Sequence, residues 1–205
     1  MDTTTYLDTW NDDKYKALFK QAQLRLTPQR AFVLINALQH ALVLEGDVIE
    51  MGVYKGSSAY IIAHTMQNSG KKLHLFDTFE GTPKHTEKDN VSREGWYGDT
   101  SLEAVGEFLK EYDFLEFHQG FIPDTFTDLP EQKYSFVHIH LNLYESTLCA
   151  LEYIYEKMSV GGVVMIEDYG LVKCAGVKLA VDNFVEKNNI HVIHLPTSQG
   201  MIIKI

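Results

Sequence analysis

Apolar side chains recur at helical spacing through the N-terminal part of the chain. Tyr15, Leu18 and Ala22 lie three or four positions apart, which places them on one face of a helix. Thr27-Pro28 then combines an N-cap with a proline at the first helical position, and a strongly apolar run follows. This pattern predicts a helical extension over residues 1–44, and its apolar helices are a candidate surface for a homodimer.

After residue 46, short apolar runs typical of buried strands alternate with segments of helical length. Strands separated by helices indicate a parallel sheet with right-handed crossovers. A short turn before the last strand indicates that this strand runs antiparallel to its neighbour. The fold class predicted is therefore α/β, a Rossmann-like, mostly parallel sheet with helices on both faces. The predicted strands are Val48–Met51, Lys72–Phe76, Leu115–His118, Ser135–His140, Val163–Glu167, His191–Leu195 and Gly200–Ile205, and the predicted helices are Ser57–Asn68, Ser101–Lys110, Tyr144–Lys157 and Val172–Lys187.

One long interval, Glu80–Thr100, interrupts this alternation. It contains several glycines and a proline, with Trp96 and Tyr97 adjacent among charged residues. A structureless loop of about twenty residues inside a compact domain is usually a lid or is disordered. The adjacent aromatic residues favour a lid, which we expect to close over a substrate.

Composition and charge narrow the class of protein. The chain has 205 residues, 45% hydrophobic and 22% charged, with a formal net charge of −10, which suits a single globular domain over residues 1–205. An acidic surface repels a phosphate backbone, so nucleic acid is not an expected partner. No signal-peptide or membrane-spanning pattern is present, and the two cysteines are too few for a disulfide framework. We therefore expect a cytoplasmic protein without a membrane partner.

The turn after the first predicted strand has the composition of a nucleotide site. Glu50 precedes Gly52, and Gly56 then leads into Ser57 and Ser58. Glycines permit a sharp backbone bend and the close approach of a ligand, and serines can cap the next helix. The run lacks the Gly-x-Gly-x-x-Gly and Gly-Lys-Ser/Thr patterns of dinucleotide and P-loop sites. A carboxylate at Glu50 would instead suit the ammonium group of an amino-acid-bearing nucleoside, although a tight turn without any ligand is the alternative.

Further candidate cofactor contacts follow the next two strands. Asp77 ends the second strand, where an acid can accept hydrogen bonds from both ribose hydroxyls; it could equally be a helix cap. Thr78 is adjacent to it. Gly120 and Phe121 follow the third strand at the expected adenine position, and Tyr54 lies within the first turn.

Several motifs resemble the macrocin O-methyltransferase (TylF/MycF-like) family of class I S-adenosylmethionine-dependent methyltransferases. The resemblance covers about residues 46 to 187, in order and in register. The matching segments are Gly46-Asp-Val-Ile-Glu-Met-Gly-Val-Tyr-Lys-Gly-Ser-Ser58, Leu75-Phe-Asp-Thr-Phe-Glu-Gly81, Leu141-Asn-Leu-Tyr-Glu-Ser-Thr147, Gly161-Gly-Val-Val-Met-Ile-Glu-Asp-Tyr-Gly170 and Ala180-Val-Asp-Asn-Phe184.

This resemblance implies a class I fold that binds S-adenosylmethionine and methylates a hydroxyl, often on a sugar of a secondary metabolite. It also implies a divalent metal, typically magnesium, held by an acid ending the fourth strand and two adjacent acids ending the fifth. Glu167-Asp168 supplies the second part of that set. The fourth strand departs from the family pattern, because His140 and Asn142 replace its two aspartates. Imidazole suits Zn, Fe, Mn or Ni better than magnesium.

Three interpretations of His140 remain open. His140, Glu167 and Asp168 could bind a metal that lowers the pKa of a substrate hydroxyl. His140, with Asp168 beside it, could instead take the hydroxyl proton itself as a general base. Alternatively, His138 and His140, which point to the same face of the strand, could be structural.

The sequence thus predicts an S-adenosylmethionine-dependent O-methyltransferase. Its expected partner is a small hydroxylated metabolite, with a sugar-containing molecule as one candidate. The alternative is a non-methylating protein that binds S-adenosylmethionine or a metal and retains the fold.

Overall fold

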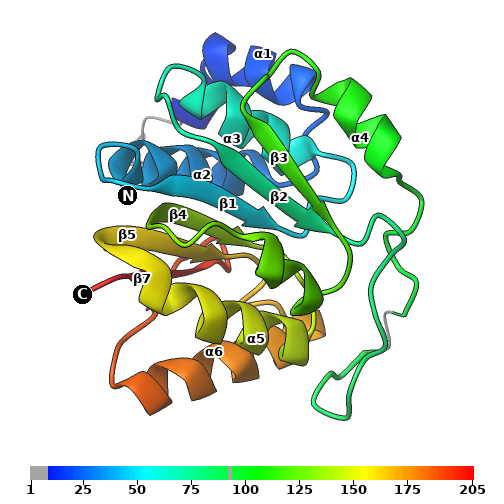
Figure 1. Ribbon diagram of the computed structural model, residues 1–205, viewed down its shortest axis with the longest axis vertical. Helices are drawn as coiled ribbons and strands as arrows, with labels where there is room; N and C mark the ends of the chain where they lie inside the picture. The colour runs from blue at the N-terminus through cyan, green and yellow to red at the C-terminus, as the bar shows by residue number, and fades with distance from the viewer. Residues whose placement is uncertain (1–8, 92–93) are drawn as a thin grey trace, which may run out of the picture.

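Seven strands among the described residues form one sheet, in the order β3-β2-β1-β4-β5-β7-β6 (Figure 1). The structure is a computed structural model that describes residues 9–91 and 94–205. β1 to β5 are parallel, and β7 runs antiparallel to both of its neighbours, as the short final turn predicted. The strands are β1 Asp47–Met51, β2 Leu73–Asp77, β3 Leu115–Gln119, β4 Tyr134–Ile139, β5 Met158–Ile166, β6 Ile193–His194 and β7 Gly200–Ile203.

Helices cover both faces of this sheet (Figure 1). One apolar core joins α1 to α4 with the sheet, and a second joins α5 and α6 with its other face. The predicted fold class is therefore confirmed. The helices are α1 Asp13–Gln21, α2 Pro28–Ala41, α3 Ser57–Met66, α4 Leu102–Phe108, α5 Tyr144–Ile154 and α6 Ala175–Asn188, with short 3₁₀ segments η1 Thr9–Asn11, η2 Asp124–Asp128, η3 Tyr155–Lys157 and η4 Val172–Cys174.

The α2 helix begins as its sequence predicts. The Thr27 hydroxyl accepts a hydrogen bond from the Arg30 backbone N–H at 3.3 Å, and Pro28 occupies the first turn. The side of α2 that carries Leu34 and Leu38 is fully buried. This capping fixes Arg30 in the first turn of a buried helix, at the end nearest the carboxyl edge of β5.

Polar residues interrupt the apolar core at the middle of the sheet. Alternation along β1 and β4 places Val48 and Phe136 in the core beneath α2 and α3, so Glu50 and His138 face the same side. The parallel register pairs Glu50 with His138. Both side chains are fully buried, and buried charged groups require partners.

The described part of residues 80–100 contains no helix or strand. It extends along one side of the molecule toward α5 (Figure 1). Asp89 Oδ1 accepts a hydrogen bond from the Tyr144 N–H at the start of α5 at 2.9 Å, and the Asn90 side chain donates to the Val172 carbonyl at 2.7 Å. These two bonds attach the loop to the start of α5 and to η4. Within the described residues, no helix is long and apolar enough to cross a membrane.

Candidate active site

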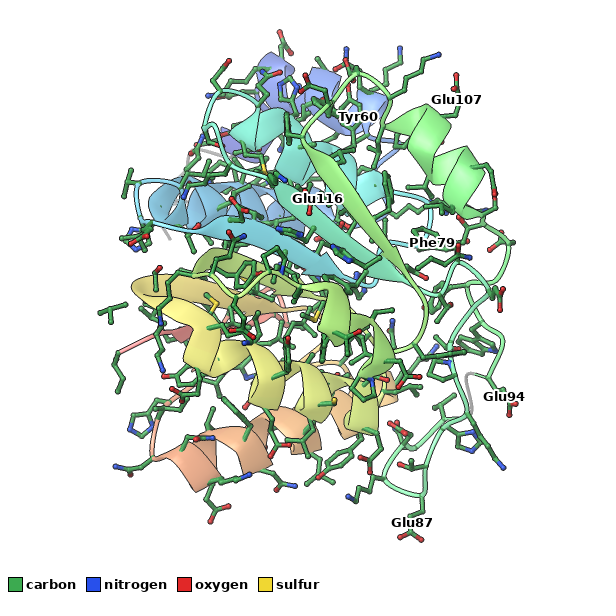
Figure 2. All side chains as sticks on the ribbon, in the orientation of Figure 1. Tyr60, Phe79, Glu87, Glu94, Glu107 and Glu116 are labelled. Atoms are coloured by element: carbon green, nitrogen blue, oxygen red, sulfur yellow. The ribbon has the colours of Figure 1, made fainter. Side chains whose placement is uncertain are left out.

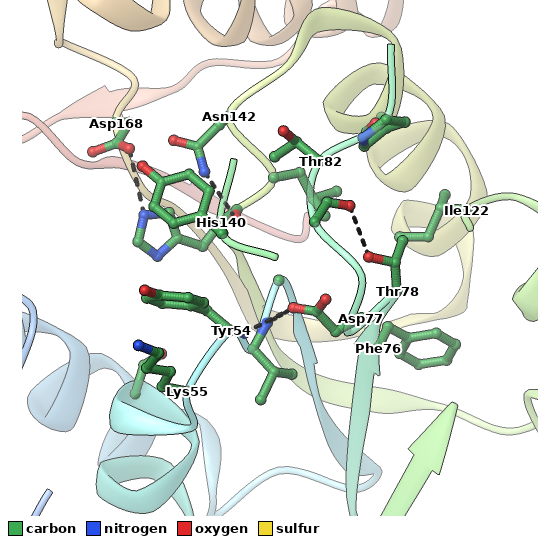
Figure 3. Close-up of a pocket in the computed structure, with 18 of the residues that line it drawn as sticks. Tyr54, Lys55, Phe76, Asp77, Thr78, Thr82, Ile122, His140, Asn142 and Asp168 are labelled. Atoms are coloured by element: carbon green, nitrogen blue, oxygen red, sulfur yellow. Dashed lines mark hydrogen bonds and ion pairs between the residues drawn. The ribbon is translucent and has the colours of Figure 1, made fainter. Parts of the chain in front are cut away.

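A cavity of about 450 Å³ opens at the carboxyl ends of β1, β2 and β4 (Figure 3). Open α/β sheets bind their ligands at this edge. Most residues predicted as site residues line it, whereas Glu50, Gly56 and Glu167 do not. The predicted residues that line it are Gly52, Tyr54, Ser57, Ser58, Asp77, Thr78, Gly120, Phe121, His140 and Asp168.

Different structural features require glycine at the two positions of the turn. Gly52 has a φ of +92°, and a Cβ there would lie 2.3 Å from the His140 carbonyl oxygen. Gly56 has a φ of +81° and is the N-cap residue of α3, packed against Val105 and Phe108. Close backbone packing between β1 and β4 therefore requires glycine at position 52, and the left-handed conformation at the N-cap favours it at position 56.

The serines that follow do not cap α3, contrary to the sequence interpretation. Gly56 occupies the N-cap position without a side-chain bond. The Ser57 hydroxyl instead accepts a hydrogen bond from the Arg25 N–H at 3.0 Å, which ties the segment before α2 to the turn. Arg25 itself lines the cavity, and its guanidinium lies 5.3 Å from the centre of the Tyr54 ring.

Asp77 holds the turn in place through backbone hydrogen bonds. Its Oδ2 accepts from the N–H groups of Val53 and Tyr54 at 2.7 and 2.8 Å, and its Oδ1 accepts from Phe79 N–H at 2.8 Å (Figure 3). Each carboxylate oxygen has two lone-pair directions, so Oδ1 keeps acceptor capacity toward the cavity. The acid predicted as a ribose contact thus also organises the turn.

Beneath the cavity, His138 bridges two buried carboxylates. Its Nδ1 lies 2.9 Å from Glu50 Oε1, and its Nε2 lies 3.3 Å from Glu167 Oε1. Burial alone lowers the pKa of His138, but the hydrogen bonds to Glu167 and Glu50 outweigh it and raise the pKa to about 9. His138 is therefore a protonated imidazolium at neutral pH.

Arg30 provides a second cation in the same cluster. Its Nη1 lies 2.8 Å from Asp168 Oδ1 and 3.3 Å from Glu167 Oε2, and its Nε donates to the Thr197 carbonyl at 2.9 Å. Gln199, fully buried, donates to Glu167 Oε1 at 2.6 Å. The turn between β6 and β7 thus contributes to the site together with α2, and neither segment was predicted to do so.

His140 and Asp168 form a pair at the cavity wall (Figure 3). His140 Nε2 lies 3.4 Å from Asp168 Oδ2, and the His140 side chain is 26% exposed. Burial alone raises the pKa of Asp168, but the hydrogen bonds and charges of His140 and Arg30 outweigh it and hold this pKa well below its usual range. Asp168 is consequently an anion that orients the imidazole of His140.

The residues expected to hold a metal do not fit one. Within residues 9–91 and 94–205, the ligand atoms of His140, Glu167 and Asp168 do not gather within 4.8 Å of one another. Arg30 already places a positive charge against both acids, and it would repel a divalent ion there. The family's two aspartates are replaced by His140 and by Asn142, which contacts the His140 carbonyl at 3.4 Å. This donor set argues against magnesium, which prefers oxygen ligands.

Other residues that line the cavity were not predicted from the sequence. The cap at Thr27-Pro28 placed Arg30 in the first turn of a predicted helix. No local pattern indicated that Arg30 would pair with acids as distant in the chain as Glu167 and Asp168. Thr82 and Tyr97, which belong to the predicted lid, also line the cavity. Gly81 and Pro83 belong to the predicted loop, and Ile122 follows Phe121 at the expected adenine position. The further unpredicted lining residues are Arg25, Leu26, Val53, Lys55, Phe76, Leu141, Asn142 and Ser146.

A sheet of this order, with its cavity at the carboxyl edge and helices on both faces, defines the class I methyltransferase fold. The O-methyltransferase NovP shares this fold, with a TM-score of 0.76 and 24% identity over 86% of this chain and 80% of that one. The chain belongs to the macrocin-O-methyltransferase (TylF) family, whose model matches residues 29–195.

Two relatives come from Streptomyces species. Demethyldecarbamoylnovobiocin O-methyltransferase of Streptomyces niveus is 29% identical over 167 residues, which are 71% of this chain and 60% of that protein. The 8-demethyl-8-(2,3-dimethoxy-alpha-L-rhamnosyl)-tetracenomycin-C 4'-O-methyltransferase of Streptomyces olivaceus is 29% identical over 63% of this chain and 55% of that protein. The matched part is thus less than two thirds of either relative.

Proposed function

We propose that the chain is an S-adenosylmethionine-dependent O-methyltransferase that methylates a hydroxyl of a small, sugar-containing metabolite, with His140 as the general base. Family membership and the names of both relatives support transfer of a methyl group to oxygen. The tetracenomycin relative is named for a rhamnosyl substrate, which favours a sugar hydroxyl as the acceptor.

The cavity suits S-adenosylmethionine in size and lining. Its volume of about 450 Å³ is within the usual range for small-molecule sites, roughly 300–1,000 Å³. Arg25 and the N–H groups at the start of α3 would hold the methionine carboxylate. Asp77 and Thr78 would hold the ribose, and Gly120 and Phe121 would flank the adenine.

Glu50 has a different role in this proposal from the one its sequence position suggested. It is fully buried, lies outside the cavity wall and contacts His138. Its carboxylate keeps His138 protonated, and His138 in turn orients Glu167. Glu50 therefore supports the site from beneath instead of binding the methionine ammonium.

The observation that carries the proposal is the pairing of His140 with Asp168. The two residues belong to a cluster of charged side chains that has one more negative than positive formal charge. Glu50, Glu167 and Asp168 contribute three formal negative charges, and Arg30 and His138 contribute two positive ones. A proton arriving on His140 brings the cluster to neutrality. Asp168, 3.4 Å from His140 Nε2, would lie beside the positive charge that a general base gains as it accepts a proton.

His140 has Nε2 directed at Asp168, and its other ring nitrogen, Nδ1, is separated from Nε2 by one ring carbon (Figure 3). Asp168 fixes the tautomer, as the carboxylate does in an Asp–His pair, so the second nitrogen is free of a proton and accepts that of the substrate hydroxyl. When bound, S-adenosylmethionine supplies a methyl group whose bond to sulfur breaks as its bond to the substrate oxygen forms. The chain's own part is to remove the hydroxyl proton and to position both reactants.

Calorimetry with S-adenosylmethionine, followed by transfer of a labelled methyl group to a panel of hydroxylated glycosides, tests this function. We expect binding and labelling of a sugar-bearing acceptor, with transfer lost in His140→Gln. Absence of binding at millimolar ligand would contradict the proposal at the cofactor step. Binding without transfer to any acceptor would favour the non-methylating alternative.

A further inference from the structure

A second cluster of ionisable side chains lies away from the cavity, on the face of the sheet near its β3 edge. His74 on β2 and Glu116 on β3 are direct neighbours in the parallel register, and His118 follows on the same side of β3. Figure 2 labels Glu116 at this position over the β2–β3 pair. None of these residues lines the cavity.

The three side chains bring their ligand atoms together. His74 Nδ1 lies 3.2 Å from His118 Nε2 and 3.3 Å from Glu116 Oε2. In the part of the chain that the structure describes, this is the group of three potential ligands whose atoms all lie within 4.8 Å of one another. Tetrahedral zinc with ligand bonds of about 2.0–2.1 Å separates its ligand atoms by about 3.3 Å, which agrees with both distances from His74 Nδ1.

Asp47 fixes the tautomer of His74 that a metal requires. Asp47 Oδ2 lies 3.4 Å from His74 Nε2, so the imidazole proton is drawn to Nε2 and the lone pair of Nδ1 is left toward the cluster. Asp47 is itself held by Gln132, whose amide donates to Oδ2 at 2.6 Å, and by the Lys72 N–H. A carboxylate behind a ligating histidine is the usual second layer of a zinc site.

The surroundings hold the two imidazole rings in place and leave the carboxylate accessible to solvent. His74 is fully buried, which restricts the orientations of its ring. The Phe76 ring stacks on His118 with centroids 4.2 Å apart and limits its rotation. Glu116 is 33% exposed, which gives an ion a path from solvent. Lys72, paired with the other oxygen of Glu116, is 59% exposed and can move outward.

We propose that His74, Glu116 and His118 form a zinc site that joins edge strand β3 to β2. Two imidazoles and one carboxylate are a zinc ligand set with a fourth position left for water. Magnesium is disfavoured because it prefers oxygen ligands. Zinc here would stabilise the strands that end at Asp77 and Gln119, and this site is separate from the methyl-transfer chemistry.

Titration of metal-stripped protein with Zn²⁺, and with Co²⁺ read by its visible absorption, tests the proposal. We expect one equivalent to bind with a tetrahedral Co²⁺ spectrum, and saturating Zn²⁺ to raise the melting temperature by about 5 °C. Glu116→Gln, a partly exposed substitution that keeps the fold, should lose this binding together with the thermal shift. Asp47→Asn should weaken it by about 10- to 100-fold.

Two histidine variants serve as controls. His40→Gln changes an exposed residue on α2, and His140→Gln changes the other histidine site; both should bind Zn²⁺ as the wild type does. Lys72→Ala should bind at least as tightly, because it removes a competing cation. Absence of binding to the wild type, unchanged binding in Glu116→Gln, or loss of binding in His140→Gln would each overturn the proposal.

Discussion

Arg30 Nη1 lies 2.8 Å from Asp168 Oδ1, and the same nitrogen lies 3.3 Å from Glu167 Oε2. The two acids at the end of β5 therefore share a cation that is part of the chain. In the sequence these acids resemble half of a metal site. In the structure, α2 places a guanidinium where a metal was expected, and His140 pairs with the remaining oxygen of Asp168.

Replacement of His140 tests the general base directly. We expect His140→Gln to reduce kcat by roughly 10²- to 10⁴-fold, the usual contribution of a positioned base. The affinity for S-adenosylmethionine should stay nearly unchanged, because His140 acts on the substrate hydroxyl. Steady-state kinetics with calorimetry separates these quantities. His40→Gln is the matched control, and unchanged turnover in His140→Gln would exclude a catalytic role for this residue.

Asp168→Asn tests the orientation of His140. Asp168 has a φ of +61°, a conformation that asparagine tolerates, so the backbone should be retained. Loss of the carboxylate removes tautomer control, and we expect kcat to fall by roughly 100-fold or more. Asp113→Asn, at an exposed position, is the control. If both variants turn over at wild-type rates, Asp168 does not orient the base.

Removal of Arg30 should be costly to stability. Its side chain is 12% exposed and those of its partners are 0% and 9% exposed, so Arg30→Met leaves two buried carboxylates without this cation. Breaking a buried pair in this way costs about 3–5 kcal/mol. Urea denaturation would measure the change. Arg25→Met removes a cation that is not paired with these acids, so it should be much less destabilising. An equal loss of unfolding free energy in the two variants would contradict the role of Arg30 as the partner of both acids.

Methyl transfer should not depend on a divalent metal at β5. With Arg30 against Glu167 and Asp168, we expect full activity after dialysis against EDTA and no more than a small effect of added Mg²⁺. Activity assays before and after chelation, with metal content measured in parallel, check this outcome. Loss of activity on chelation, with recovery by Mg²⁺ alone, would restore the metal hypothesis.

Stability should fall as pH rises above neutrality because of His138. Its pKa is about 9 in the folded protein and about 6.5 in an unfolded chain. Its contribution is fully present below about pH 6.5 and is lost as pH rises through about 9, for a total on the order of 3 kcal/mol. Chemical denaturation across this range measures it. The free energy of unfolding should depend less steeply on pH in His138→Gln than in the wild type. The same pH dependence in both proteins would contradict a buried imidazolium.

Asp89 should hold the described part of the loop, residues 80–91 and 94–100, beside the cavity. Its two oxygens accept from Tyr144 N–H and Thr86 N–H, so Asp89→Ala removes a cap from α5 at a cost of about 1 kcal/mol. We also expect the KM for the acceptor to rise and hydrogen exchange to quicken in the loop. Glu87→Ala, an exposed change in the same loop, is the control. Unchanged KM and exchange would show that the loop is held by other contacts.

Much of the fold could be predicted from local patterns. The strand Val48–Met51, the turn at Gly52 and the cap at Thr27 follow from periodicity and from residue preferences over a few positions. The last turn of α5 and the first turn of α6 could not be placed as well, because η3 and η4 continue the helical pattern of the sequence as tighter 3₁₀ turns. The predicted positions of Asp77 and His140 at the cavity were correct, because parallel strands bring their carboxyl ends to one edge of the sheet.

The sequence by itself determined the order of strands and helices, the glycine turn and the edge at which the chemistry gathers, since these depend on neighbours close in the chain. Only the tertiary structure decided which charges meet. Arg30 reaches Asp168 across 138 positions, and Glu50, which the sequence suggested as a cofactor contact, lies buried against His138. Such pairings depend on how α2 packs against the sheet and on the register between strands, which no local pattern encodes.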